Sequence, residues 1–334
     1  MRFDRPTRRR ALTIFAATAA GVFTGDSFPA GAATDYEWRG TAMGAEARIL
    51  LSGIDAATAT RVVATAAQEI ERLEQALSLF RTDSEICRLN ASQVLHAPSA
   101  DFRRALSLAL AVAQATDGLF DPTVQALWEA HVDWFTADPH RPVPPDDVLA
   151  GPLQAVDWRR ISLRPDAVRL GEGQRITLNG MGQGYVTDRV ADLLIEQGLR
   201  HVLVDLGEQR ALGPRRDGSA WRIARQDEAP LSLHDGALAT SEGRGCIIGA
   251  SGAHHLFDPH TGRSARHWQR VTVHHRSAAI ADALSTGLSA TSPGQVSQII
   301  GRVDGTKVWA RDAQGKNWHW PADVTGGRAR LTQA

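Results

Sequence analysis

The sequence predicts an α+β fold, also described as mixed α/β, in which helices pack on a mostly antiparallel sheet. Two observations carry this prediction: long helical stripes of apolar residues in the first half, and a series of short strand-like segments in the second half. The 43% hydrophobic content of the 334 residues is ample for a sizeable core.

The first half of the chain predicts one strand and two helices. Residues 46–51 alternate as a strand does, and residues 56–77 carry one apolar stripe at helical spacing. A second helix is expected over 101–115, and glycine and aspartate after it predict a loop at 117–122. Residues 137–152 are rich in proline and aspartate without periodicity, so we expect a surface connection there.

The second half resumes with a strand at 175–178, a glycine cluster at 179–184 and a helix at 185–197. This order favours phosphate binding, because small residues let the backbone approach a ligand and amides at a helix start attract anions. A tight packing turn is the alternative, since the cluster is neither a dinucleotide fingerprint nor a P-loop. The remaining expected elements are strands at 201–205, 221–224, 245–249, 271–274 and 307–310 and a helix at 278–290.

Residues 1–32 are predicted to be a twin-arginine signal peptide. Arg8-Arg9-Arg10 precedes the apolar run 11–23, and Ala30-Gly31-Ala32 is an A-x-A cleavage site. An ordinary secretory signal is the alternative. The run is too short to span a bilayer stably, so we expect a periplasmic chain that does not span the membrane after cleavage. The mature chain keeps 32 basic and 35 acidic residues, which gives no support for nucleic-acid binding.

The cysteines and histidines do not predict a zinc site. Cys87 and Cys246 lie far apart in no metal-ligand pattern, and they could pair or remain two independent thiols, which we favour. The histidines are scattered and form no H-E-x-x-H motif.

One carboxylate and two hydroxyls lie close together in the otherwise apolar segment Ala281-Asp282-Ala283-Leu284-Ser285-Thr286. In a helix, Asp282, Ser285 and Thr286 share one face because they lie at i, i+3 and i+4. A carboxylate beside hydroxyls offers the hard oxygens that suit magnesium. A helix cap or a solvated polar face is the alternative at this spacing.

Six motifs stand in order along the chain. They are Gly40-Thr41-Ala42-Met43-Gly44, Phe80-Arg81-Thr82-Asp83-Ser84-Glu85-Ile86, residues 117–124, residues 178–188, His255-Leu256-Phe257-Asp258-Pro259 and the 281–286 segment. This ordered set resembles the ApbE family of FAD:protein FMN transferases. The resemblance covers essentially the whole mature chain and implies one such domain over 33–334.

The resemblance implies an enzyme that cleaves the pyrophosphate of FAD, transfers FMN as a phosphoester to a threonine or serine of an acceptor protein and releases AMP. It also implies magnesium as the cofactor. By motif position, the metal ligands would be Asp282, Thr286, Ser285 through its carbonyl, and the carbonyl of Gly180. The FAD contacts would be Met43, Phe80, Leu119, Phe120, Asp121, Thr177, Gln183 and Phe257.

Such chemistry needs mainly positioning and charge neutralisation, so Asp282 would act first as a metal ligand. His255 or an aspartate would accept the proton of the acceptor hydroxyl, because imidazole titrates near working pH. The alternative for His255 is a structural, hydrogen-bonded histidine.

Two positions depart from the family pattern. The usual Asp-Leu-Gly-Gly-Ile-Ala-Lys-Gly has become Thr177-Leu178-Asn179-Gly180-Met181-Gly182-Gln183-Gly184, so an aspartate and a lysine are replaced by neutral residues. This variant, with Val204-Asp205-Leu206-Gly207-Glu208, resembles the NosX branch of nitrous oxide respiration (denitrification). That resemblance implies the periplasmic flavin domain of NosR as acceptor. The alternatives are an FAD pyrophosphatase that releases FMN and AMP, and a non-catalytic flavin-binding assembly protein.

Overall fold

An eight-stranded antiparallel sheet lies at the centre of the protein, in a computed structural model that describes residues 35–225 and 228–321. Its order is β1-β2-β6-β7-β10-β13-β14-β15. The strands are β1 (Tyr36–Ala42), β2 (Ala45–Leu51), β6 (Val202–Asp205), β7 (Gln209–Leu212), β10 (Gly236–Glu242), β13 (Trp268–His275), β14 (Lys307–Asp312) and β15 (Asn317–Trp320). The predicted signal at 1–32 lies outside the described residues. Within 35–225 and 228–321, no helix is long and apolar enough to cross a membrane.

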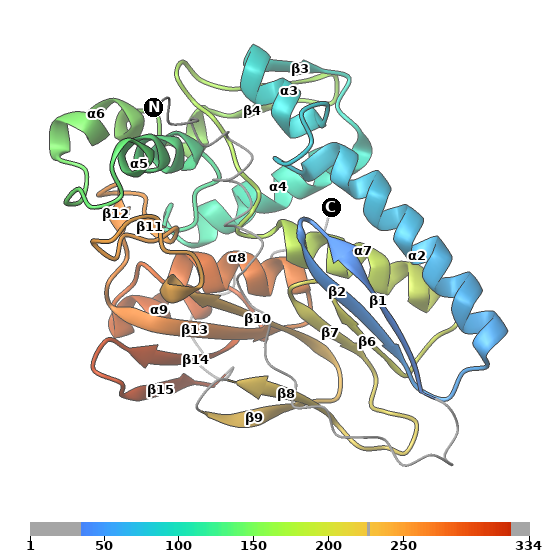
Figure 1. Cartoon of the computed structure of the whole chain (residues 1–334). Coiled ribbons are helices and arrows are strands. Elements are labelled where there is room, and N and C mark those ends of the chain that lie inside the picture. The colour runs from blue at the N-terminus through green and yellow to red at the C-terminus, as the bar shows by residue number, and fades with distance from the viewer. Residues whose placement is uncertain (1–34, 226–227, 322–334) are drawn as a thin grey trace, which may run out of the picture.

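Helices cover one face of this sheet in two tiers (Figure 1). The inner tier is α7 (Gly182–Glu196) and α8 (Ala278–Leu288), and outside it lie α2 (Ala56–Leu77) and α4 (Ala100–Ala115). The main hydrophobic core fills the space between these helices and the sheet. Helix α8 is buried on nearly every side, which explains why its sequence is apolar apart from Asp282, Ser285 and Thr286.

A hairpin covers part of the opposite face of the sheet. It consists of β8 (Trp221–Arg225) and β9 (Glu228–Leu233), which Figure 1 shows on the side away from the helices. Trp221 and Leu233 pack there against Leu203 and Leu238 of the sheet in a second, smaller core. Burial on both faces accounts for the continuous apolar run of β6.

Short elements frame these layers. They are α3 (Glu85–Ser92), β3 (Val94–His96), α5 (Gln125–Ala137), α6 (Asp146–Gln154), η2 (Trp158–Arg160), β4 (Ser162–Leu163), β5 (Ala167–Arg169), η3 (Gly243–Gly245), β11 (Phe257–Asp258), β12 (Arg263–Ser264) and α9 (Pro293–Ile300). Both Cys87 on α3 and the buried Cys246 carry free thiols.

Two strands that the sequence predicts are absent, and one helix was not foreseen. The expected surface connection at 137–152 is mostly exposed, and it contains most of α6, a helix that begins after Pro145 and turns Leu149 inward. Residues 175–178 form no strand: the backbone of Ile176 bonds the side-chain amide of Asn90 instead of a neighbouring strand. Residues 245–249 also form no strand and fold back in turns with one isolated bridge.

Helix α7 begins three residues earlier than the sequence predicts, which places Gln183 and Gly184 in its first turn. Gly184 is the contact point between α7 and α8. A Cβ atom built on it would lie 2.4 Å from the carbonyl oxygen of Ala278 and 2.8 Å from the Cα of Ala279. The two helices approach this closely only because residue 184 has no side chain.

We expect Gly184→Ala to lower the free energy of unfolding by about 1–3 kcal/mol, because the added methyl group overlaps backbone that cannot move aside cheaply. Urea denaturation checks this value. Gly151→Ala in α6 is the matched control, since a methyl group there meets nothing within 4 Å. Equal stability of both variants would contradict the tight α7–α8 contact.

Candidate functional site

A cavity of about 740 Å³ opens where the start of α7 and the middle of α8 meet the end of β10. This volume suits a nucleotide-sized ligand. Among its lining residues are nine of those that the sequence predicts for the site: Met43, Phe80, Thr177, Gly180, Gln183, His255, Phe257, Asp282 and Thr286. Segments separated by more than 200 residues therefore converge on one cavity.

The wall formed by α8 brings three predicted metal ligands together. Asp282 is 5% exposed, and its Oδ2 accepts a hydrogen bond of 3.0 Å from the N–H of Gly184. One turn later, the hydroxyl of Thr286 donates to the carbonyl oxygen of Gly180 at 3.2 Å. A Cβ on Gly180 would lie 3.0 Å from Thr286 Cγ2, so glycine lets this carbonyl approach the helix.

Ser285 is fully buried behind this wall and does not line the cavity. Its hydroxyl lies 2.7 Å from the hydroxyl of Ser241 on β10 and donates to the carbonyl oxygen of Asp282 at 3.0 Å. Ser241 also lies 3.4 Å from Thr286 Oγ1. The side chain of Ser285 thus joins α8 to β10, and its predicted role through the backbone carbonyl stays a prediction.

Burial raises the pKa of the Asp282 carboxyl to about 7, against the lowering effect of the Gly184 N–H. The negative charge of Asp188 raises this pKa further. Glu208, in the turn between β6 and β7, lines the same cavity, and burial followed by the charge of Asp282 holds its pKa well above the ordinary value.

These donors fit a magnesium ion. The residues that the structure describes contain no group of three His, Cys, Asp or Glu side chains arranged for a metal. Magnesium needs no such group, because it binds through one or two carboxylates and otherwise keeps water or substrate phosphate oxygens. A buried carboxylate, a hydroxyl and a carbonyl oxygen on one wall offer that kind of incomplete shell.

We expect the stability of the cation-free protein to fall as pH rises from about 4 to 7 on account of Asp282. Its pKa of about 7 lies above the ordinary 3.8, so in this window the folded state holds a proton that the unfolded state releases. His255 and His275, with pKa values lowered to about 4 by burial, contribute the opposite slope. The difference between wild type and Asp282→Asn isolates the carboxylate. Urea unfolding in EDTA at several pH values measures this difference in the free energy of unfolding. Identical pH profiles of the two proteins would contradict the raised pKa of Asp282.

His255 lies in the cavity wall as a neutral imidazole. Burial, followed by the charge of His254, lowers its pKa to about 4. Its Nδ1 lies 3.4 Å from the carbonyl oxygen of Cys246. A carbonyl oxygen only accepts, so a hydrogen bond between these atoms puts the proton of the neutral ring on Nδ1. A neutral imidazole is chemically able to accept a proton, although so low a pKa makes it a weak base.

Aromatic side chains form another part of the cavity wall. The ring of Phe257 lies 4.5 Å from that of His131 and 6.4 Å from that of Trp128. Trp128 and Phe257 both line the cavity, so this end offers ring surface for a planar ligand.

The predicted FAD contacts at 119–121 lie behind the cavity wall. Phe120 packs against Gly180 and Gly287, and Asp121 accepts hydrogen bonds from Thr123 and from the N–H of Trp158. None of Leu119, Phe120 and Asp121 is among the lining residues. Their direct contact with FAD stays a prediction, whereas their support of the Gly180 region is visible.

The turn between β1 and β2 presents Met43 to the cavity in an unusual backbone conformation. Met43 has φ 51° and Gly44 has φ 82°, as two-residue hairpin turns require. The N–H of Met43 donates to Glu74 Oε1 of α2 at 2.6 Å. The ring of Phe80 lies against Gly44, where a Cβ would come within 3.1 Å. The turn is thus held from two sides.

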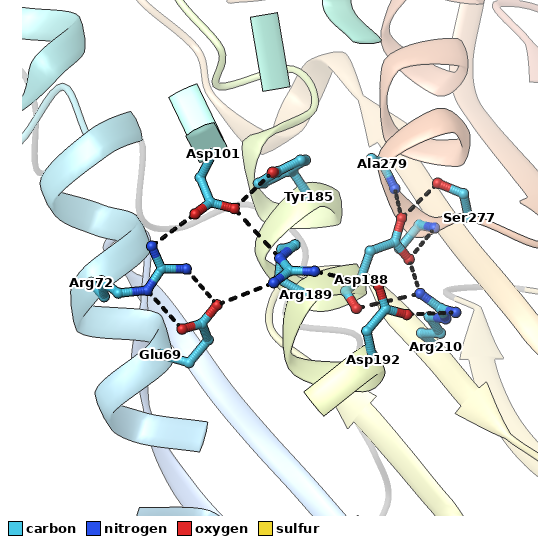
Figure 2. Close-up of polar contacts among 11 residues, drawn as sticks. Glu69, Arg72, Asp101, Tyr185, Asp188, Arg189, Asp192, Arg210, Ser277 and Ala279 are labelled. Carbon is cyan, nitrogen blue, oxygen red and sulfur yellow. Dashed lines mark hydrogen bonds and ion pairs between the residues drawn. The ribbon is translucent and has the colours of Figure 1, made fainter. Parts of the chain in front are cut away.

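Asp188 of α7 anchors the start of α8 (Figure 2). Its carboxylate accepts hydrogen bonds from the hydroxyl of Ser277 and from the N–H groups of Ala278 and Ala279, at 2.5, 2.8 and 3.0 Å. Arg210 of β7 pairs with the same carboxylate at 2.6 Å. A negative charge at this helix start satisfies amides that would otherwise lack partners.

A second network in Figure 2 fixes the outer helices to α7. Asp101 of α4 accepts from Arg72 of α2 at 2.7 Å and from the hydroxyl of Tyr185 at 3.1 Å. Arg189 extends this network to Glu69. The helix that carries Gln183 and Gly184 is therefore tied to both tiers.

Comparison with known proteins agrees with this architecture. The model of the ApbE family matches residues 43–309, which include every residue placed in the cavity wall apart from Arg311. The chain belongs to the ApbE family. This confirms the family resemblance and the α+β fold class that the sequence predicts.

Relatives of this ApbE family protein are similar over most of its length. The FAD:protein FMN transferase of Escherichia coli is 26% identical over 84% of this chain and 86% of its own. That of Treponema pallidum is 30% identical over 65% and 67%, respectively. Among solved structures, the ApbE protein of Thermotoga maritima matches with a TM-score of 0.75 at 25% identity, over 87% of this chain and 98% of its own. The names of the curated relatives agree with the enzyme class that the sequence predicts.

Glu208 and Ser241 are among the cavity-lining residues that sequence reasoning missed. Glu208 lies in the turn after the apolar strand β6, where a charged residue next to glycine was the available signal. Ser241 gave no such signal, because only the pairing of β10 with its neighbours brings it to α8.

Proposed function

We propose that this protein is an exported, magnesium-dependent FAD:protein FMN transferase. The observation that carries the proposal is the meeting of Asp282, Thr286 and the Gly180 carbonyl on one wall of a nucleotide-sized cavity. The names of the relatives support the reaction, and the twin-arginine motif at 1–32 supports export to the periplasm.

In this proposal the residues divide into those that hold the phosphates and those that hold the flavin. Asp282, Thr286 and the Gly180 carbonyl would hold Mg²⁺, which when bound neutralises charge on the pyrophosphate. Gln183 in the first turn of α7 donates a neutral amide hydrogen bond where the helix amides also favour anions.

In this proposal, aromatic side chains contact the flavin, and His255 acts on the acceptor hydroxyl. Phe80 and Phe257 present aromatic faces to the isoalloxazine, while Thr177 offers a hydroxyl to a polar group of FAD. His255 accepts the proton of the attacking threonine or serine hydroxyl while the phosphoester bond forms and AMP leaves with the electrons of the broken phosphoanhydride. Burial of the wall keeps water from competing with the acceptor.

We further propose the flavin domain of NosR as the acceptor, which places the protein in nitrous oxide respiration. The support is the sequence variant at 177–184, together with the Asp205-Leu206-Gly207-Glu208 turn and the export motif.

The experiment is to incubate the mature protein with FAD, MgCl₂ and a NosR flavin domain and to record intact masses. We expect acceptor that carries one covalent FMN, with AMP in equal amount. FMN and AMP without adduct would identify an FAD pyrophosphatase instead. FAD binding with neither product would identify a non-catalytic flavin-binding assembly protein, which the neutral Thr177 and Gln183 would then explain.

A further inference from the structure

Glu208 is a buried carboxylate that faces the cavity, and within the part of the chain that the structure describes no cationic side chain pairs with it. It is 5% exposed and lines the same cavity as Asp282. Its Oε2 accepts one long hydrogen bond, 3.3 Å, from the N–H of Thr240, and no described residue donates to its Oε1 or forms an ion pair with it. Leaving a carboxylate buried in this way is costly unless a cation or a proton joins it.

Asp205, the last residue of the preceding strand β6, is an acidic residue whose charge other side chains compensate. It pairs with Arg48 at 2.8 Å and accepts from Gln209 at 3.2 Å, and it does not line the cavity. Its charge is satisfied within the protein. The difference between these two acidic residues therefore lies in what each faces: Asp205 faces an arginine, and Glu208 faces the cavity.

We infer that Glu208 is a second carboxylate of the divalent-cation site, which it completes together with Asp282. This inference rests on the proposed function, because it concerns the same cation. Two carboxylates balance the charge of Mg²⁺, and affinity for such ions follows the number of charged ligands.

The residue beside Glu208 fits this assignment. The side-chain amide of Gln183 lies directly on Gly207, where a Cβ would come within 2.5 Å of its Nε2. The side-chain amide of Gln183 carries no charge, so it supplies no counter-charge to the neighbouring Glu208.

The test is a Mn²⁺ titration of the full mature protein followed by electron paramagnetic resonance, with and without FAD. We expect Glu208→Gln to weaken Mn²⁺ binding by about 10-fold or more. Asp205→Asn is the matched control, because it removes a buried negative charge from the same turn but not from the cavity. We expect its Mn²⁺ affinity to stay within about 2-fold of wild type. Circular dichroism and urea unfolding show that each variant is folded.

The outcomes separate this inference from the proposed function. If Asp282→Asn loses Mn²⁺ and Glu208→Gln keeps wild-type affinity, the second carboxylate is refuted while the magnesium-dependent transferase stands. If Asp205→Asn weakens Mn²⁺ as much as Glu208→Gln, a general charge effect replaces coordination and the inference also fails. Wild-type protein that binds no Mn²⁺ with or without FAD overturns both.

Discussion

Asp282→Asn is expected to lower the rate of flavin transfer by about 10³-fold, the size of loss seen when a charge-stabilising group is removed from an active site. Asparagine keeps the shape of the side chain and still accepts the hydrogen bond from Gly184, so the backbone contact survives. The carboxylate charge that would hold the cation is lost. Intact-mass kinetics with FAD, MgCl₂ and acceptor measure the rate, and fluorescence of FAD measures whether the flavin still binds.

Thr286 supplies the matched comparison for that variant. Thr286→Ser keeps the hydroxyl that donates to the Gly180 carbonyl, and we expect its transfer rate to stay within about 10-fold of wild type. Thr286→Val keeps the volume without the hydroxyl and should lose far more. Unchanged transfer in Asp282→Asn, with normal FAD binding, would show that the α8 wall holds no catalytic cation.

Asp188→Ala is expected to lower the free energy of unfolding by about 3–5 kcal/mol, because it removes a buried carboxylate that bonds Ser277 and Arg210 and leaves Arg210 only its longer contact with Asp192. The same change removes the acceptor for the first amides of α8, as Figure 2 shows. The start of the helix that carries Asp282 would no longer be fixed to α7. Urea denaturation gives the loss of stability. A Mn²⁺ titration of the folded protein shows whether the positions of Asp282 and Thr286 on α8 are disturbed.

Asp192→Ala tests whether the burial of Asp188 is the cause. Asp192 contacts the same Arg210 at 3.4 Å, but its side chain is 41% exposed, compared with 7% for Asp188. Exposed ion pairs contribute little, so the expected loss is below about 1 kcal/mol. Equal losses in the two variants would mean that Arg210, rather than the helix start, decides the effect.

The sequence predicted the layers of the fold well where one physical signal dominated. The apolar stripe of α2 gave its bounds to the residue, because a long helix on a core must repeat at helical spacing. Residues 175–178 misled for the opposite reason: Asn90, 86 residues away from Ile176, supplies the backbone partner that a strand would have supplied. Such a tertiary hydrogen bond leaves no local pattern.

The site was predictable to the extent that its residues share one helix or one motif. Asp282 and Thr286 lie together because of their i, i+4 spacing, and the Gly180 carbonyl joined them only through the family resemblance. The motif that contains Glu208 predicts no role for it, because its burial and the absence of a described residue that forms an ion pair with it depend on how β6, β7 and α8 pack. Sequence spacing carries no information about either property.

The strand order of the central sheet also determines how late in synthesis this cavity can form. The hairpin that carries Met43 pairs with β6, which emerges about 150 residues later, and β10 waits for β13 before it is bordered on both sides. Contacts so distant along the chain form slowly, because the intervening loops must close first. A nascent chain that has not yet reached α8 holds the turn that carries Met43 and the glycine cluster but lacks the wall that carries Asp282 and Thr286. The cavity is thus among the last features to be completed, after nearly the whole polypeptide has been made.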